Sequence, residues 1–184
     1  MAAEGGAILA YVGLGSNLAG PADQVRRACA ALARLPETRL LKTSRLYISP
    51  PLGPVDQPDY VNAVAALATE LEPRALLAHL QAIEAAHGRS RQGPRWGPRT
   101  LDLDLLIHGR EIWDEPGLRL PHPEIPRRAF VLVPLAEVAP LEIEIPGMGT
   151  LEALLAACPP EGLALLTATA GCEGEAGLAE SSLA

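Results

Sequence analysis

The chain is 184 residues long with a formal net charge of −7, which suits one domain with a substantial core and argues against general nucleic-acid binding. Its apolar runs are all shorter than the about 18 residues that a membrane helix needs. Its first residues lack the basic and apolar regions of a secretory signal. The three cysteines show no metal-ligand spacing and fit reduced thiols, so we expect a cytoplasmic protein.

The first predicted elements are a strand over residues 8–14 and a helix from Pro21 to about residue 35 with one apolar face. A Gly-x-Gly at residues 13–15 ends the strand. It suggests a dinucleotide-binding loop, but the third glycine of that motif is missing, so we favour a tight turn. A second strand is predicted over residues 40–48.

A proline-rich segment follows over residues 49–62, with four prolines and one glycine before Tyr60. This composition predicts a stiff loop with little secondary structure. Tyr60 offers a stacking surface, and the Asn62 amide offers two donors and an acceptor, so the loop could recognise a flat polar ligand. Alternatively, both residues merely begin a strand and pack there. Taken alone, the segment does not decide between the two.

Residues 61–70 are apolar on both faces, which predicts a central strand. A second helix should run from Pro73 to about residue 87 and stop at Gly88. Glu84 lies in its last turn, where the helix dipole disfavours an acid.

Residues 89–107 combine a basic loop with an acidic strand. Four arginines and two Gly-Pro pairs predict a loop, and from residue 101 apolar and acidic residues alternate, so that Asp102 and Asp104 share one face of a strand. This face could simply be the solvated side of an amphipathic strand. However, Asp is depleted in strands, and neighbouring arginines suit phosphate oxygens. The combination therefore favours a site for Mg²⁺ and a polyphosphate.

The remaining elements are a hairpin with its turn at residues 108–110, a helix to about residue 138, and a last helix over residues 151–157 capped by Thr150. We divide the chain into one domain over residues 1–160 and a C-terminal extension over residues 161–184. The end of the extension is small, acidic and aperiodic, which predicts partial disorder.

Three separated motifs resemble those of the 6-hydroxymethyl-7,8-dihydropterin pyrophosphokinases, enzymes of folate biosynthesis. They are Arg95-Trp-Gly-Pro-Arg-Thr-Leu-Asp-Leu-Asp-Leu-Leu, the opening Gly15-Ser-Asn-Leu together with the loop of residues 50–62, and Pro121-His-Pro with Arg128-Ala-Phe. The resemblance spans about residues 8–157. It implies that ATP gives its β,γ-pyrophosphoryl unit to the hydroxymethyl oxygen of the pterin and leaves as AMP.

The resemblance also implies an α+β fold, a ferredoxin-like sandwich with an antiparallel sheet, helices packed on it and extended catalytic loops. The predicted order strand-helix-strand-strand-helix-strand agrees with it independently. Two positions depart from the family pattern: Gly117 stands where an arginine is frequent, and Pro123 where a tyrosine is common.

Roles for individual residues follow from the same resemblance. Asp102 and Asp104 would bind two Mg²⁺ ions that bridge the ATP phosphates, and Arg89 and Arg91 would join them in catalysis. The residues around ATP would be Glu84, Trp96, Arg99, His122 and Arg128, although a lone histidine such as His122 is more often structural. The pterin would lie between Tyr60 and Phe130, with Asn62 at its edge, and the site would include Ser49, Pro50 and Leu52.

The implied partners are small molecules only, ATP and the pterin, bound by a monomer without nucleic acid or membrane. The proton of the attacking alcohol could pass to Asp104 or to solvent, and the sequence leaves both open. Two rival hypotheses remain. One is another Mg-dependent enzyme, such as a nucleotidyltransferase, and the other is a non-catalytic ferredoxin-like module that binds a nucleotide or other ligand.

Overall fold

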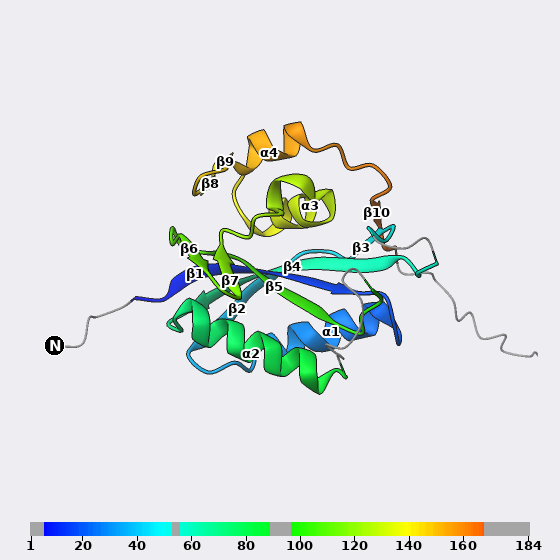
Figure 1. Cartoon of the computed structure of the whole chain (residues 1–184), viewed down its shortest axis with the longest axis horizontal. Helices are drawn as coiled ribbons and strands as arrows, with labels where there is room; N and C mark the ends of the chain where they lie inside the picture. The colour runs from blue at the N-terminus through cyan, green and yellow to red at the C-terminus, as the bar shows by residue number, and fades with distance from the viewer. Residues whose placement is uncertain (1–5, 53–55, 89–96, 168–184) are drawn as a thin grey trace, which may run out of the picture.

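The computed structural model describes residues 6–52, 56–88 and 97–167 (Figure 1). Its elements follow in the order β1 (Ile8–Ser16), α1 (Pro21–Leu32), β2 (Thr38–Thr43), β3 (Tyr47–Ser49), β4 (Tyr60–Thr69), α2 (Pro73–Ala86), β5 (Asp102–His108), β6 (Trp113–Glu115), β7 (Leu118–Leu120), a 3-10 turn (Ile125–Arg127), α3 (Ala129–Val138), β8 (Glu144–Ile145), β9 (Gly149–Thr150), α4 (Leu151–Ala157) and β10 (Ala164–Leu165).

The main sheet is antiparallel throughout. β4 lies between β1 on one side and β2 and β3 on the other, β1 also pairs with β5, and β10 pairs with β3 at the opposite edge. The α+β class and the antiparallel sheet with helices packed on it are therefore confirmed. The more specific ferredoxin-like assignment stays a prediction.

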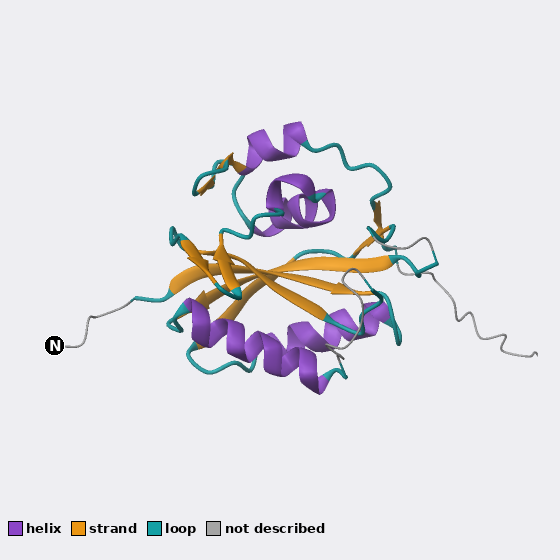
Figure 2. Ribbon diagram, in the orientation of Figure 1, coloured by secondary structure: helices purple, strands orange, loops and turns teal. Residues whose placement is uncertain are grey.

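Helices α1 and α2 cover one face of this sheet and α3 covers the other, with α4 on the outer side of α3 (Figure 2). β4 supplies both cores because side chains of a strand point alternately to its two faces. Ala65 and Leu67 pack in the core beneath α1 and α2, whereas Val64 and Ala66 pack beneath α3. This double burial confirms the prediction that β4 is a central strand.

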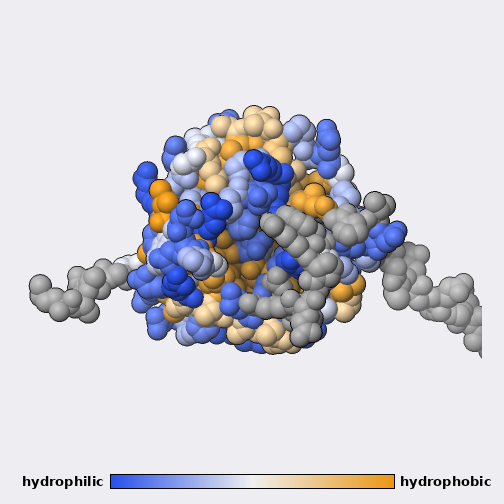
Figure 3. Space-filling model, viewed as in Figure 1, coloured by the Kyte–Doolittle hydropathy of each residue, from blue (hydrophilic) through white to orange (hydrophobic). Residues whose placement is uncertain are grey.

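Apolar residues show in a recess near the middle of the surface in Figure 3, and hydrophilic residues predominate around the β6–β7 hairpin. No helix within the three described ranges is long and apolar enough to cross a membrane.

Two predicted elements were wrong. The strand predicted over residues 40–48 is divided into β2 and β3. The division lies at Ser44, because its buried hydroxyl accepts the Val64 N–H at 2.9 Å, a hydrogen bond that a backbone carbonyl would accept in a continuous strand. The turn predicted at residues 108–110 forms, because the Glu111 N–H donates to the His108 carbonyl at 3.0 Å, but it closes no hairpin within the described residues. The hairpin joins β6 and β7 instead, and it turns at Gly117, whose φ of +83° favours glycine.

The predicted last helix is confirmed as α4, and the Thr150 hydroxyl accepts the Ala153 N–H at 3.2 Å as its cap. After α4 the chain returns to the sheet as β10, so residues 164–165 of the predicted extension form a strand. Residues 168–184 lie outside the described part, and the disorder predicted there stays a prediction.

Candidate active site

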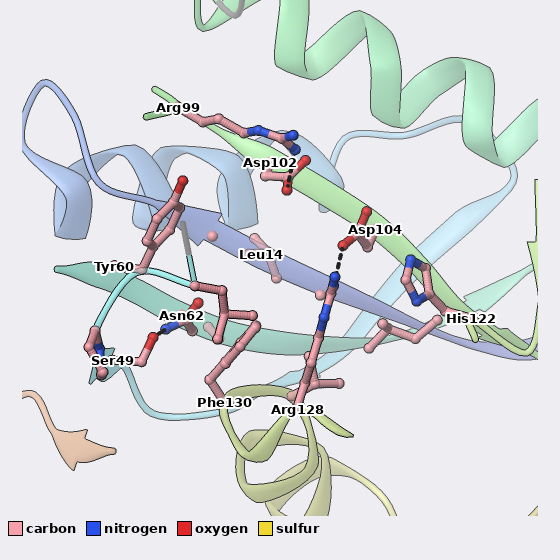
Figure 4. Close-up of a pocket in the computed structure, with 17 residues that line it drawn as sticks. Leu14, Ser49, Tyr60, Asn62, Arg99, Asp102, Asp104, His122, Arg128 and Phe130 are labelled. Carbon is pink, nitrogen blue, oxygen red and sulfur yellow. Dashed lines mark hydrogen bonds and ion pairs between the residues drawn. The ribbon is translucent and has the colours of Figure 1, made fainter. Parts of the chain in front are cut away.

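A cavity opens on the α3 face of the sheet, where β1, β4 and β5 meet the N-terminus of α3 (Figure 4). The structure brings to this one cavity most of the residues that the sequence proposed as a site. Those that line it are Ser49, Pro50, Leu52, Tyr60, Asn62, Arg99, Asp102, Asp104, His122, Arg128 and Phe130. The first and last of these residues are more than 80 positions apart in the sequence, so it is the fold that brings them together.

The alternation predicted for the acidic strand is confirmed in β5. Leu103 and Leu105 are buried in the core beneath α1 and α2, while Asp102 and Asp104 point to the opposite face and line the cavity (Figure 4). The apolar residues thereby fix which face the carboxylates take, because a shift of one residue would bury both acids.

The Gly-x-Gly of residues 13–15 forms neither a dinucleotide loop nor a tight turn. Both glycines lie inside β1, where Gly13 pairs with Asp104 and Gly15 pairs with Asp102. A Cβ atom on Gly15 would lie 3.6 Å from the Asn62 Oδ1 atom. The glycines therefore keep the cavity floor free of side chains between the carboxylates of β5 and the amide of β4.

Each carboxylate faces an arginine. Arg99 Nη1 lies 2.7 Å from Asp102 Oδ2, and Arg128 Nη1 lies 3.6 Å from Asp104 Oδ2. Burial raises the pKa of Asp104, and the negative charge of Asp102 raises it further, while His122 and the two arginines oppose the increase. Two acids and two guanidinium groups thus face one another at this end of the cavity.

His122 stands beside Asp104 and is fixed by its own loop. Its backbone N–H donates to the Leu106 carbonyl at 2.8 Å, and its Nδ1 atom accepts the Glu124 N–H at 3.2 Å. Burial lowers the pKa of His122, and the Arg128 charge lowers it further against the opposing Asp104 charge. A neutral ring that accepts at Nδ1 carries its proton on Nε2 and can donate there.

The other end of the cavity is neutral. The Asn62 Nδ2 atom donates to the Ser49 hydroxyl at 2.8 Å, and both side chains are buried. Tyr60 and Phe130 lie near this pair, and the Tyr60 hydroxyl donates to the Gly97 carbonyl at 3.0 Å (Figure 4). The Arg128 guanidinium lies 5.7 Å from the centre of the Phe130 ring, so this arginine spans both ends.

Ser16 and Asn17 hold the loops around the cavity, a role that the sequence did not reveal. The buried Asn17 side chain accepts the Arg99 N–H at 2.8 Å and donates to the Pro58 carbonyl at 3.1 Å. Ser16 donates to the Thr100 carbonyl at 2.6 Å. These bonds tie the proline-rich loop to the segment that carries Arg99. The one sequence signal for this role is the position of two short polar residues at the end of a strand.

Glu84 lies on α2, is buried, and accepts the Leu103 N–H of β5 at 2.7 Å. It supports the strand between the two aspartates, and it is not among the described residues that line the cavity. Arg89, Arg91 and Trp96 lie outside the described residues.

A second hollow adjoins the cavity and shares Asp104 and His122 with it. Gly117 and Pro123, the two positions that depart from the family pattern, both line this hollow, and so does Arg119 of β7. The two departures from the family pattern therefore lie in one continuous region beside the carboxylates.

Residues 11–140 match the family described as 7,8-dihydro-6-hydroxymethylpterin-pyrophosphokinase (HPPK). A 2-amino-4-hydroxy-6-hydroxymethyldihydropteridine pyrophosphokinase of Pseudomonas aeruginosa is 57% identical over 153 residues, which cover 83% of this chain and 93% of that protein. The protein of the same name from Haemophilus influenzae is 53% identical over 132 residues, which cover 72% of this chain and 82% of that one.

Among solved structures, HPPK-DHPS of Plasmodium falciparum with pteroate superposes with a TM-score of 0.63 at 13% identity, over 84% of this chain and 43% of that chain. This likeness concerns the fold alone, and the chain spans less than half of that larger protein. The family match covers more than half of the chain, and both sequence relatives are more than half identical to it. The chain belongs to the 7,8-dihydro-6-hydroxymethylpterin-pyrophosphokinase family.

Proposed function

We propose that this chain transfers the β,γ-pyrophosphoryl unit of ATP to the hydroxymethyl oxygen of 6-hydroxymethyl-7,8-dihydropterin, a step of folate biosynthesis. Family membership supports the reaction, and the cavity supports its location. The observation that carries the assignment is the joining of a carboxylate pair and a buried amide–hydroxyl pair in one cavity. A transfer between a polyphosphate and a flat polar ring needs both.

At the charged end, Asp102 and Asp104 are proposed to hold two Mg²⁺ ions that arrive with ATP. The fit rests on the donors: two carboxylates on one strand face supply the hard oxygen ligands that Mg²⁺ uses, and substrate phosphates commonly complete its coordination. Bound there, Mg²⁺ would neutralise charge on the phosphate oxygens. Arg99 and Arg128, now facing the carboxylates, can turn to the phosphates once the carboxylates bind metal.

ATP is proposed to extend from this end along His122 into the second hollow, which shares Asp104 and His122 with the cavity. Glu84, which the sequence placed near ATP, is proposed to act on the ATP site indirectly, through its hydrogen bond to β5. Roles for Arg89, Arg91 and Trp96 rest on the sequence resemblance alone.

At the neutral end, the pterin is proposed to stack between Tyr60 and Phe130 with its pyrimidine edge toward Asn62. Because Nδ2 of Asn62 is held by Ser49, its Oδ1 atom is oriented and can accept from the ligand. A buried amide that is satisfied only by the correct ligand discriminates strongly against analogues. Pro50 and Leu52 would close this end of the site.

The chemistry is a displacement at the β-phosphorus. The hydroxymethyl oxygen forms a bond to that phosphorus, the bond to the α,β-bridging oxygen breaks, and AMP leaves with the electron pair. The hydroxyl proton passes to Asp104 or to solvent. Such transfers depend on alignment and charge neutralisation more than on covalent help, which suits a site whose carboxylates and amide are carried by strands of one sheet.

The test is incubation with Mg²⁺, the pterin and ATP labelled at the β-phosphorus, followed by separation of products. We expect AMP and a labelled pterin diphosphate in equal amounts. Release of pyrophosphate would indicate a nucleotidyltransferase, and tight binding of both ligands without turnover would indicate a non-catalytic module.

We further propose that a single chain in the cytoplasm suffices for activity and that residues 1–160 supply the groups that contact the two substrates. The described residues of one chain supply both the carboxylate pair and the buried Asn62–Ser49 pair of the cavity, which supports activity as a monomer. A molar mass near twice 19.3 kDa in solution, at concentrations where the enzyme is active, would contradict this.

A further inference from the structure

The segment after α4 returns to the edge of the sheet, where β10 lies next to β3 (Figure 1). In β10, Ala164 pairs with Ile48 and Leu165 pairs with Tyr47, both on β3. The next residue continues the ladder, because the Leu166 N–H donates to the Leu46 carbonyl at 2.8 Å. Residues 161–166 thus form an ordered border along β3.

β3 needs such a border. It is three residues long, and its other edge pairs with β4, where Tyr47 lies opposite Asn62 and Ser49 opposite Tyr60. Ser49 is also the acceptor that holds the Asn62 amide. Without β10, β3 would be a short edge strand with one row of its backbone groups unpaired in the ladder.

The same segment packs against Pro50, the residue that follows β3. Gly162 has a φ of +69°, and a Cβ atom there would lie 3.2 Å from the Cγ and Cδ atoms of Pro50. Contact at this distance is tighter than most Cβ atoms show, so the chain fits against the Pro50 ring because residue 162 has no side chain. Pro50 in turn lines the cavity.

We propose that residues 161–166 position the pterin wall of the site, with Gly162 setting Pro50 and Leu166 holding β3 so that Ser49 orients the Asn62 amide. Gly162 and Leu166 are positioning residues, and they touch neither substrate. The proposal rests on the proposed pterin site, and it makes the start of the C-terminal segment a working part of that site.

The main test compares Gly162→Ala with Gly147→Ala. Both glycines have positive φ, +69° and +73°, so both variants carry a similar backbone penalty. A Cβ atom on Gly147, in the β8–β9 turn, meets nothing within 4 Å, whereas one on Gly162 meets Pro50. We expect Gly162→Ala to raise the pterin KM about fivefold or more above the Gly147→Ala value, with the ATP KM unchanged.

A second pair isolates the hydrogen bond of Leu166. Leu166→Ala and Leu166→Pro both remove the leucine side chain, but only the proline variant also loses the N–H that donates to the Leu46 carbonyl. We expect the pterin KM to rise further in Leu166→Pro than in Leu166→Ala. Melting temperatures, measured for all four variants, separate this effect from general loss of stability.

Equal pterin KM values in Gly162→Ala and Gly147→Ala would overturn the proposal, as would a parallel rise in both substrate KM values. Asn62→Ala serves as the reference for the site itself. If Asn62→Ala raises the pterin KM while Gly162→Ala does not, the positioning role fails and the pterin site stands. If neither variant changes it, the proposed pterin site fails as well.

Discussion

The two ends of the cavity are built on different principles. Asp102 and Asp104 lie across from Arg99 and Arg128, so the charged end is held by groups that would exchange partners on binding of the proposed metal-bound polyphosphate. The neutral end is held by one buried hydrogen bond between Asn62 and Ser49, a fixed geometry with no charge to redistribute. The first end should therefore respond to charge and the second to shape.

The largest effect is expected at the charged end. Asp104→Asn keeps the shape of the side chain but removes a charge from a proposed metal site. We expect kcat to fall at least about a hundredfold, the scale of losing one preorganised electrostatic group. Asp102→Asn should behave alike. Steady-state kinetics at millimolar Mg²⁺ measure kcat for both variants. Near-normal turnover of Asp104→Asn would contradict the proposed metal site.

The neutral end should respond to a single amide. Asn62→Ala removes the group proposed to meet the pterin edge, and we expect pterin binding to weaken by about 1–3 kcal/mol, the cost of leaving a buried polar group unpaired. ATP binding should barely change. Calorimetric titration with each ligand measures this. An equal loss for both ligands would mean that Asn62 serves the fold rather than the pterin.

Asn17 connects the two ends, because it bonds to the backbone of both Arg99 and Pro58. Asn17→Ala should therefore weaken both ligands together, by about 1 kcal/mol each, the net worth of an ordinary hydrogen bond. The same titrations show whether the losses are shared. A loss confined to one ligand would mean that the two loops are positioned independently.

The smallest effect is expected at Glu137 of α3, which is not among the described residues that line the cavity. Its carboxylate accepts from the Arg45 side chain and backbone N–H, each at 2.8 Å, and from the Tyr47 hydroxyl. Burial raises the pKa of Glu137, but these hydrogen bonds and the Arg45 charge outweigh it, so the net pKa is lowered.

A lowered folded-state pKa stabilises the fold fully above the unfolded value of about 4.3, and the contribution is lost as the pH falls through the folded value. Glu137→Gln should therefore lower the melting temperature by a few degrees at pH 7, and the difference from the parent should shrink below about pH 4. Thermal unfolding between pH 3 and pH 7 tests this. A difference that does not depend on pH would assign the loss to packing instead.

The sequence predicted the parts of the fold and site that depend on periodicity. Alternation set the faces of β5, and apolar residues on both faces marked β4 as central. It missed features that depend on tertiary contacts. The glycines of residues 13–15 show their purpose only once β1 lies between Asn62 and the aspartates, and Asn17 only once two distant loops meet it. β10 escaped prediction because two residues carry no periodic signal.

The most direct test of the two-ended site is a crossed set of titrations. Asp102→Asn and Asn62→Ala are each titrated with the pterin and with a non-hydrolysable ATP analogue plus Mg²⁺, each ligand alone and in the presence of the other. The two-ended site predicts that Asp102→Asn weakens the nucleotide and Asn62→Ala weakens the pterin, each with little effect on the opposite ligand alone. If each variant weakens both ligands equally when titrated alone, the division of the cavity into a charged end and a neutral end is wrong.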